Sequence, residues 1–241
     1  MEDVFRMLDR QELIRLGLHA RDLADLEDES DRAYAGVLSR AVAGIAEAYQ
    51  STLSALVAAL DARERETADH SQRVVRFTVA IAERLAVPAE HLEQIARGAL
   101  LHDIGKIGIS DNILLKPGPL TPVEWTSMRR HPEIGHQILR GIPFLLPAAE
   151  IVLCHQERWD GGGYPHKLRG EAIPLGARIF AIADTLDAMT SDRPYRKAAT
   201  FAEARLEISR CGGTQFDPRC VQAFADIPDD EFEALRQEHA A

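Results

Sequence analysis

The stretch Ala99-Leu100-Leu101-His102-Asp103-Ile104-Gly105-Lys106 decides how this chain is expected to fold. Its apolar residues belong to a predicted helix that covers residues 91 to about 103. His102 and Asp103 are ionisable groups inside this apolar run, and burying an unpaired charge is costly. Lys106 follows the pair at three and four residues, so it shares their helical face. The stretch therefore predicts a buried helix in which His102 and Asp103 have a specific role.

Apolar residues keep a helical spacing on both sides of this stretch. Val74, Phe77, Ile81 and Leu85 recur in steps of three and four residues, which predicts a helix before it. After it, Thr121-Pro122-Val123-Glu124 has the composition of a capping box and predicts another helix start. We find no strand-like alternation of useful length and no internal repeat in the sequence. The predicted fold class is all-α, a helical bundle with an N-terminal helical extension.

The sequence predicts two parts, residues 1–61 and residues 62–241. A proline-free segment over residues 31–61 predicts one long helix, and its apolar seam consists of Leu38, Val42, Ile45, Tyr49, Leu53, Leu56 and Leu60. Such a seam has two interpretations. The helix pairs with its copy in a homodimer, or it lies on its own domain.

Composition narrows the class of protein. The chain has 241 residues, of which 46% are hydrophobic, and a formal net charge of −10, which argues against general affinity for nucleic acid. No apolar run approaches the roughly 18–20 residues that cross a bilayer, and the acidic, mixed N-terminus does not resemble a secretory signal. Three cysteines without a CxxC spacing favour a reducing compartment. We therefore expect a cytoplasmic protein that binds neither nucleic acid nor membrane.

Potential metal ligands lie at the borders of several apolar helices. Glu66 and His70 are four residues apart and project from one helical face. His131 precedes a proline at a predicted helix start, His155 ends an apolar stretch, and Asp184 lies on a buried-looking face. Each alone has an ordinary interpretation, a hydrogen-bonded core histidine or an acid paired with an arginine. Together with His102 and Asp103 they indicate a metal site, and mixed histidine and carboxylate ligands suit iron, manganese or zinc better than calcium or magnesium.

At this point the chain resembles a known family. His102-Asp103 with Gly105-Lys106 resembles the HD-x-GK core of the HD phosphohydrolase superfamily. The stretch from His155 to Pro165, HQERWDGGGYP, is similar to the HHExxDGxGYP signature of the HD-GYP subfamily, with Gln156 in place of the second histidine. The stretches 182–196 and 213–218 resemble its later blocks. The resemblance covers about residues 62–226 and leaves residues 1–61 uncovered.

The resemblance implies an HD-domain helical bundle that hydrolyses cyclic di-GMP to the linear dinucleotide pGpG, to GMP, or to both. It implies two or three divalent metal ions, iron or manganese. Asp103 would bridge two ions, Glu66 matches the glutamate of members that carry a third ion, and Gln156 is a weaker ligand than the histidine it replaces. The implied metal ligands are Glu66, His70, His102, Asp103, His131, His155, Asp184 and, at one position, Gln156.

The resemblance also implies catalytic and substrate-binding residues. Asp103 and Lys106 would be catalytic, with Lys106 stabilising charge on the phosphate or hydroxide; the alternative is a structural ion pair with Asp103. Arg193 and Arg196 would bind the substrate phosphates, for which the planar guanidinium fork is suited, or would serve as ordinary helix caps. Gly163, Tyr164 and Pro165 would contact substrate and a diguanylate-cyclase-type partner, or would form only a tight turn.

Two other functions remain open from the sequence. The same ligands suit another phosphohydrolase reaction, such as hydrolysis of a nucleotide or of a different cyclic dinucleotide, because they act on the phosphate and not on the base. Alternatively, Gln156 marks a catalytically weak module that binds a ligand or partner and signals through residues 31–61. The retained His102-Asp103 pair and Lys106 argue against this second alternative.

Overall fold

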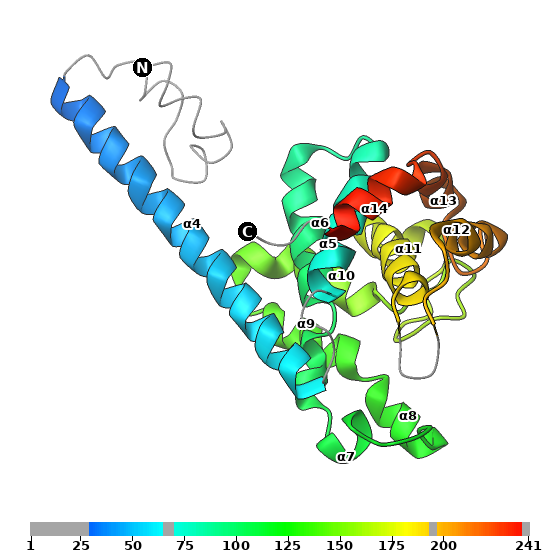
Figure 1. Cartoon of the computed structure of the whole chain (residues 1–241). Helices are drawn as coiled ribbons and strands as arrows, with labels where there is room; N and C mark the ends of the chain where they lie inside the picture. Colours follow the sequence, from blue (N-terminus) through cyan, green and yellow to red (C-terminus); the bar gives the residue numbers. More distant parts are fainter. Residues whose placement is uncertain (1–28, 65–69, 193–196, 238–241) are drawn as a thin grey trace. The chain divides into compact units, whose positions relative to one another are not determined.

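A computed structural model describes residues 29–64, 70–192 and 197–237. Within these ranges every regular element is helical, and the only pairing of strand type is an isolated bridge between Gly212 and Phe216. The predicted all-α class is confirmed (Figure 1). Among the described helices, none has both the length and the apolar character needed to span a bilayer.

The helices follow one another with short connections. The longest is α4, and the helices after it that carry the site are α5, α6, η1, α9, α10 and α11. Their bounds are α4 Glu29–Glu64, α5 His70–Arg84, α6 Ala89–Leu101, η1 Ile104–Gly108, α7 Asp111–Leu114, α8 Pro122–Met128, α9 His131–Leu139, η2 Pro143–Leu145, α10 Leu146–Cys154, η3 Gly170–Ala172, α11 Leu175–Thr190, α12 Phe201–Arg210, α13 Pro218–Ala225 and α14 Asp229–Gln237.

The structure divides into two units, residues 1–55 and residues 56–241. The described part of the first unit is a single helix, which confirms the long helix expected over residues 31–61. The second unit contains the last turns of α4 and all later helices. The predicted division after residue 61 stays a prediction.

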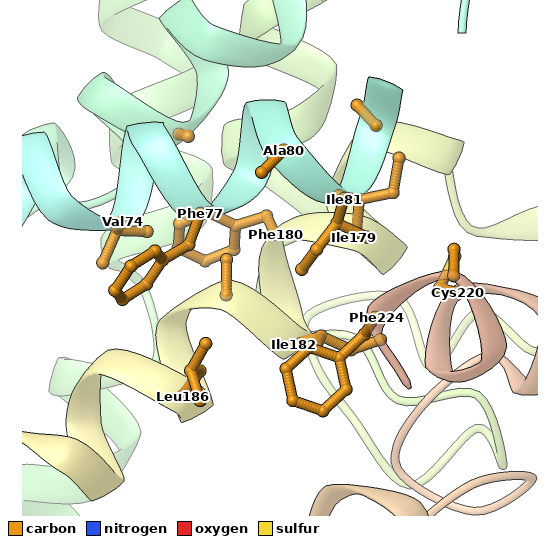
Figure 2. Close-up of a cluster of buried hydrophobic side chains, with 14 of the residues drawn as sticks. Val74, Phe77, Ala80, Ile81, Ile179, Phe180, Ile182, Leu186, Cys220 and Phe224 are labelled. Carbon is orange, nitrogen blue, oxygen red and sulfur yellow. The ribbon is translucent and has the colours of Figure 1, made fainter. Parts of the chain in front are cut away.

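The core of the second unit lies between α5, α6, α10 and α11, with α12 to α14 closing one side. Phe77 of α5 and Phe180 of α11 are almost completely buried and pack with Ile81 and Phe224 (Figure 2). Removing such side chains from water supplies most of the stabilisation, at roughly 1.5–3 kcal/mol for each large apolar side chain. This core fixes the faces of α5, α6, α10 and α11 from which polar side chains project.

Two local features position the polar stretch that follows α6. A β-carbon on Gly105 would lie 1.9 Å from the carbonyl oxygen of His131, so only glycine lets η1 approach α9 this closely. Helix α8 begins as expected: Thr121 is the N-cap, Pro122 occupies the first position, and Glu124 completes the capping box. Together they fix the path of the chain around His131.

The end of α4 is joined to η1 and the residues after it. The guanidinium of Arg63 donates hydrogen bonds to the carbonyl oxygens of Lys106, Ile107 and Ile109 at 3.1, 3.2 and 2.6 Å. It also pairs with the carboxylate of Asp111 at 2.6 Å. These contacts add side-chain donors to main-chain acceptors of η1 and of the residue after it, so the last turn of α4 supports the segment that carries Lys106.

Candidate metal centre

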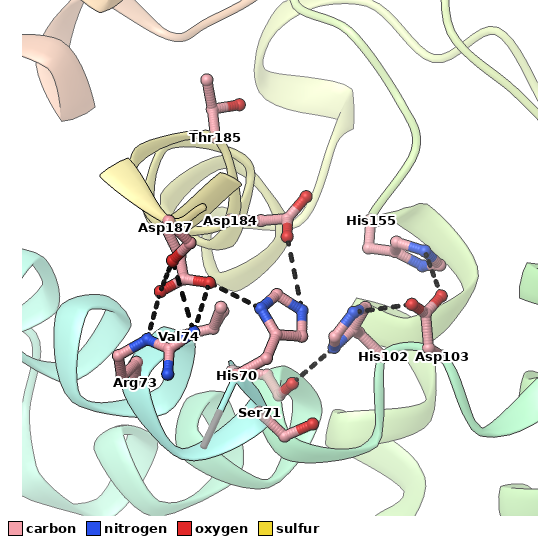
Figure 3. Close-up of polar contacts among 12 residues, drawn as sticks. His70, Ser71, Arg73, Val74, His102, Asp103, His155, Asp184, Thr185 and Asp187 are labelled. Carbon is pink, nitrogen blue, oxygen red and sulfur yellow. Dashed lines mark hydrogen bonds and ion pairs between the residues drawn. The ribbon is translucent and has the colours of Figure 1, made fainter. Parts of the chain in front are cut away.

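Two groups of three side chains meet in the second unit. One group contains His70, His102 and Asp184, and the other contains Asp103, His131 and His155. Within each group the potential ligand atoms all lie within 4.8 Å of one another. Figure 3 shows His70 and Asp184 facing His102, with Asp103 and His155 on its other side. Of the residues between positions 66 and 184 that were expected to converge, these six lie together.

Each of these side chains comes from a helix end or from a helix face beside the core. His70 begins α5, His131 begins α9, and His102 and His155 are the C-caps of α6 and α10. Asp184 lies in the middle of α11. The apolar residues next to them bury these helices, so the four histidines are at most 9% exposed.

All four histidines are oriented in the same way. The Nδ1 atoms of His102, His131 and His155 lie 2.8, 2.7 and 2.6 Å from main-chain carbonyl oxygens. The Nδ1 atom of His70 lies 2.7 Å from a carboxylate oxygen of Asp187. A carbonyl or carboxylate oxygen can only accept a hydrogen bond here, so each Nδ1 carries the proton. Each Nε2 therefore faces the centre, where it is the atom that a metal ion would take as its ligand.

The distances around Asp103 show how close the two groups are. One oxygen of Asp103 lies 3.4 Å from His131 Nε2 and 3.7 Å from His155 Nε2, and the other lies 3.0 Å from His102 Nε2. His70 Nε2 lies 3.9 Å from an oxygen of Asp184. The Nε2 atoms of His131 and His155 are only 3.1 Å apart. Two lone pairs at this distance repel one another unless a cation or a proton lies between them, so this donor set fits divalent metal ions.

Charge and burial act together on these groups. Burial opposes the charge of Asp103, but His102 and Lys106 hold its pKa well below the usual range. Burial and the neighbouring His131 lower the pKa of His155 to about 3, so its ring is neutral at physiological pH. Burial also lowers the pKa of His131. The group around Asp103 thus combines an ionised carboxylate with two neutral imidazoles.

Lys106 lies between two carboxylates. Its ammonium nitrogen is 2.8 Å from Asp103 and 2.7 Å from Glu64. Burial lowers the pKa of Lys106, but these two carboxylates raise it overall, so the side chain stays charged. The ion pair with Asp103 that the sequence allowed is therefore present, and it places the ammonium beside the centre.

The Gly-Tyr-Pro loop packs against the end of α10. A β-carbon on Gly163 would lie 2.5 Å from the main chain of Glu157 and Arg158, so glycine is needed for this contact. The buried carboxylate of Glu157 accepts hydrogen bonds from the main-chain N–H groups of His166 and Leu168 at 2.7 and 3.1 Å. The bond between Tyr164 and Pro165 is cis. The centre of the Tyr164 ring lies 6.4 Å from that of His131, edge to face.

Some predicted residues are not tested by these contacts. Glu66, Arg193 and Arg196 lie outside the described residues. The main-chain carbonyl of Gln156 accepts a hydrogen bond from Tyr164 at 3.2 Å, and a role for its side chain in metal binding stays a prediction.

Asp187 and Arg73 have a role in the structure that was not expected from the sequence. Asp187 is 1% exposed, accepts from His70, and pairs with Arg73 at 2.6 Å (Figure 3). A carboxylate that fixes the outer nitrogen of a ligand histidine sets the tautomer and the ring orientation. The available signal was spacing: Asp187 follows Asp184 by three residues, and Arg73 follows His70 by three, so each pair shares a helical face.

Comparison with known proteins defines the family. The model of the family described as "HD domain" matches residues 54–220, so this chain belongs to the HD-domain family. The resemblance drawn from the sequence is thereby confirmed.

Several curated relatives are phosphodiesterases by name. The chain is 45% identical over 181 residues to the cyclic di-GMP phosphodiesterase response regulator RpfG of Xanthomonas campestris, a match covering 74% of this chain and 48% of that protein. A cyclic di-GMP phosphodiesterase of Thermotoga maritima is 43% identical over 73% of this chain and 48% of its own length. A 3'3'-cGAMP-specific phosphodiesterase of Vibrio cholerae is 39% identical over 75% of this chain and 35% of its own. The chain thus spans about half the length, or less, of these relatives.

A solved structure has the same fold. A cyclic GMP-AMP-specific phosphodiesterase of Vibrio cholerae superposes with a TM-score of 0.56 at 21% identity, covering 77% of this chain and 52% of that one. At this identity the likeness concerns the fold alone.

Proposed function

We propose that this chain is a metal-dependent phosphodiesterase that hydrolyses cyclic di-GMP to linear pGpG, GMP or both. The observation that carries the proposal is the common orientation of four buried histidines, each turning Nε2 toward Asp103 or Asp184. The names of the relatives support the substrate class.

The ligand sets follow from the two groups. His70, His102 and Asp184 would hold one divalent ion, and Asp103, His131 and His155 would hold another, with Asp103 near enough to His102 to bridge them. Glu66 and Gln156 are the proposed further ligands, and the ions are iron or manganese on the grounds of ligand chemistry. Such ions would supply Lewis acidity toward a water molecule and a phosphate oxygen.

The chain's own side chains then orient the substrate. Lys106 carries a permanent positive charge beside Asp103, so it can stabilise negative charge that develops on a phosphate oxygen. Arg193 and Arg196 are proposed to bind the substrate phosphates. Gly163, Tyr164 and Pro165 are proposed to contact the substrate, and the ring of Tyr164 lies beside that of His131.

Turnover by metal-loaded protein tests the proposal. Protein prepared without oxygen and loaded with Mn²⁺ or Fe²⁺ is expected to convert cyclic di-GMP to pGpG or GMP, as measured by chromatography of the products. Asp103→Ala is expected to abolish turnover while circular dichroism shows an intact helical fold. Tight binding of cyclic di-GMP without turnover in loaded wild-type protein would contradict the proposal and favour a silent signalling module.

Partners and location are also proposals. A homodimer through residues 31–61 is supported by Val37 and Ile45, which are 57% and 55% exposed although large and apolar. A diguanylate-cyclase-type partner would contact the Gly-Tyr-Pro loop. All three cysteines are free thiols, which supports a reducing, cytoplasmic compartment.

A further inference from the structure

The guanidinium of one arginine lies close to two aromatic rings beside the candidate metal centre. The guanidinium carbon of Arg129, the C-cap of α8, lies 5.9 Å from the centre of the Trp125 ring and 5.5 Å from that of Tyr164. Trp125 is 45% exposed, Arg129 is exposed, and Tyr164 is half-buried. We call Trp125, Arg129 and Tyr164 the stacking ledge.

The stacking ledge is fixed relative to the two ligand groups. His131 Nδ1 donates to the carbonyl oxygen of Met128, the last residue of α8, at 2.7 Å. The Tyr164 ring contacts His131 edge to face at 6.4 Å. If the phosphate of a substrate lies at the centre, the sugar and base next to that phosphate would therefore reach the stacking ledge.

The composition of the stacking ledge matches a nucleobase. Aromatic faces and the guanidinium plane are the groups on which proteins stack bases, because each base offers a π-face. The indole of Trp125 is 45% exposed, so part of its surface is accessible to a ligand. The guanidinium adds a fork of donors that fits the acceptor edge of a guanine.

We propose that the stacking ledge is the subsite for a purine base of the cyclic dinucleotide, with Trp125 and Arg129 as specificity-determining residues. This inference rests on the proposed function for its substrate. The base lies against Trp125 and the guanidinium of Arg129, and the ledge orients the sugar-phosphate ring over the centre. The ledge takes no part in the chemistry at the phosphate.

Two substrates separate base recognition from chemistry. Trp125→Ala and Arg129→Ala are each expected to lower kcat/KM for cyclic di-GMP about tenfold or more, mainly through KM, which is the scale of base–aromatic stacking. Both variants are expected to keep kcat/KM for methyl p-nitrophenyl phosphate, a small phosphodiester without a base, within about twofold of wild type. Arg130→Ala removes the same charge one residue away, also at an exposed position. It is expected to leave kcat/KM unchanged for both substrates. Equal losses for both substrates, or no loss for cyclic di-GMP, would overturn the inference.

Fluorescence tests the contact without turnover. Trp125 is one of two tryptophans, and a base stacked on it is expected to quench its emission when metal-loaded protein is titrated with cyclic di-GMP. Trp125→Phe, a mild change at an exposed site, is expected to lose this quenching. Quenching without hydrolysis would support the ledge and contradict the proposed function. Hydrolysis with no quenching that depends on Trp125 would do the reverse.

Discussion

At the scale of single residues, each candidate ligand histidine is fixed by one hydrogen bond at its outer nitrogen, Nδ1. Three of these bonds use main-chain carbonyls, which cannot be removed by substitution. His70 alone depends on a side chain, Asp187, which Arg73 in turn holds. This makes Asp187 the residue through which the orientation of a ligand can be tested.

Asp187→Asn is expected to weaken metal binding at the His70 group by about 10–100-fold, because an amide no longer fixes the tautomer of His70. Titration of metal-free protein with Mn²⁺, followed by calorimetry, measures the effect. Asp217→Asn is the matched control: Asp217 is similarly buried and pairs with Arg178 at 2.6 Å in another part of the unit. It should lower the thermal midpoint and leave metal affinity unchanged. Equal affinities for Asp187→Asn and wild type would contradict the orienting role.

Gly105→Ala tests the close approach of η1 and α9. Its β-carbon would meet the carbonyl of His131 at 1.9 Å, so the free energy of unfolding should fall by about 1–3 kcal/mol, as in other overpacked sites. Metal content should fall with it, because Asp103 and His131 move apart. Gly141→Ala is the control, since no atom lies within 4 Å of its β-carbon position. The free energy of unfolding is measured with denaturant and the metal content by metal analysis. Equal values of both quantities in the two variants would contradict this prediction.

Most of the candidate ligands could be recognised in the sequence because they lie at the borders of apolar helices, where a buried polar residue requires a partner. Asp187 and Arg73 could not be recognised in the same way. Their roles depend on how α5 and α11 cross, which periodicity along one helix does not determine. The pairing of Lys106 with Glu64 was missed for the same reason, since it joins residues 42 positions apart.

At the scale of elements, several side-chain contacts join the end of α4 to the segment from η1 to α7. Arg63 binds three carbonyl oxygens and Asp111, and the neighbouring Glu64 binds Lys106. The sequence predicted the long helix, but not that its last turn supports the proposed catalytic lysine. The Arg63 contacts depend on main-chain acceptors, which residue type does not reveal.

Arg63→Ala is expected to lower the free energy of unfolding by about 1–2 kcal/mol, because several charge-assisted hydrogen bonds are lost. The value of kcat for cyclic di-GMP should also fall, since Lys106 loses its support. Arg84→Ala breaks an exposed ion pair with Glu231, and such pairs contribute at most about 1 kcal/mol. Chemical unfolding and steady-state kinetics measure the two effects. Equal losses of unfolding free energy and kcat in the Arg84 and Arg63 variants would contradict this prediction.

At the scale of the whole molecule, the apolar face of α4 predicts self-association. Val37 and Ile45 are spaced by eight residues, so they share one face of the helix. Replacing both with glutamate should convert a dimer into a monomer in sedimentation velocity experiments. A monomeric wild-type chain would contradict the proposed homodimer. That result would not bear on the proposed metal centre.

The central claim is that side chains between positions 70 and 184 bind divalent ions together. The most direct test is the number of ions per chain in anaerobically prepared protein, determined by elemental analysis after loading with Mn²⁺ or Fe²⁺ and removal of excess metal. The account predicts at least two ions per chain, and fewer after Asp103→Ala. Wild-type protein that keeps less than one ion per chain under these conditions would contradict it.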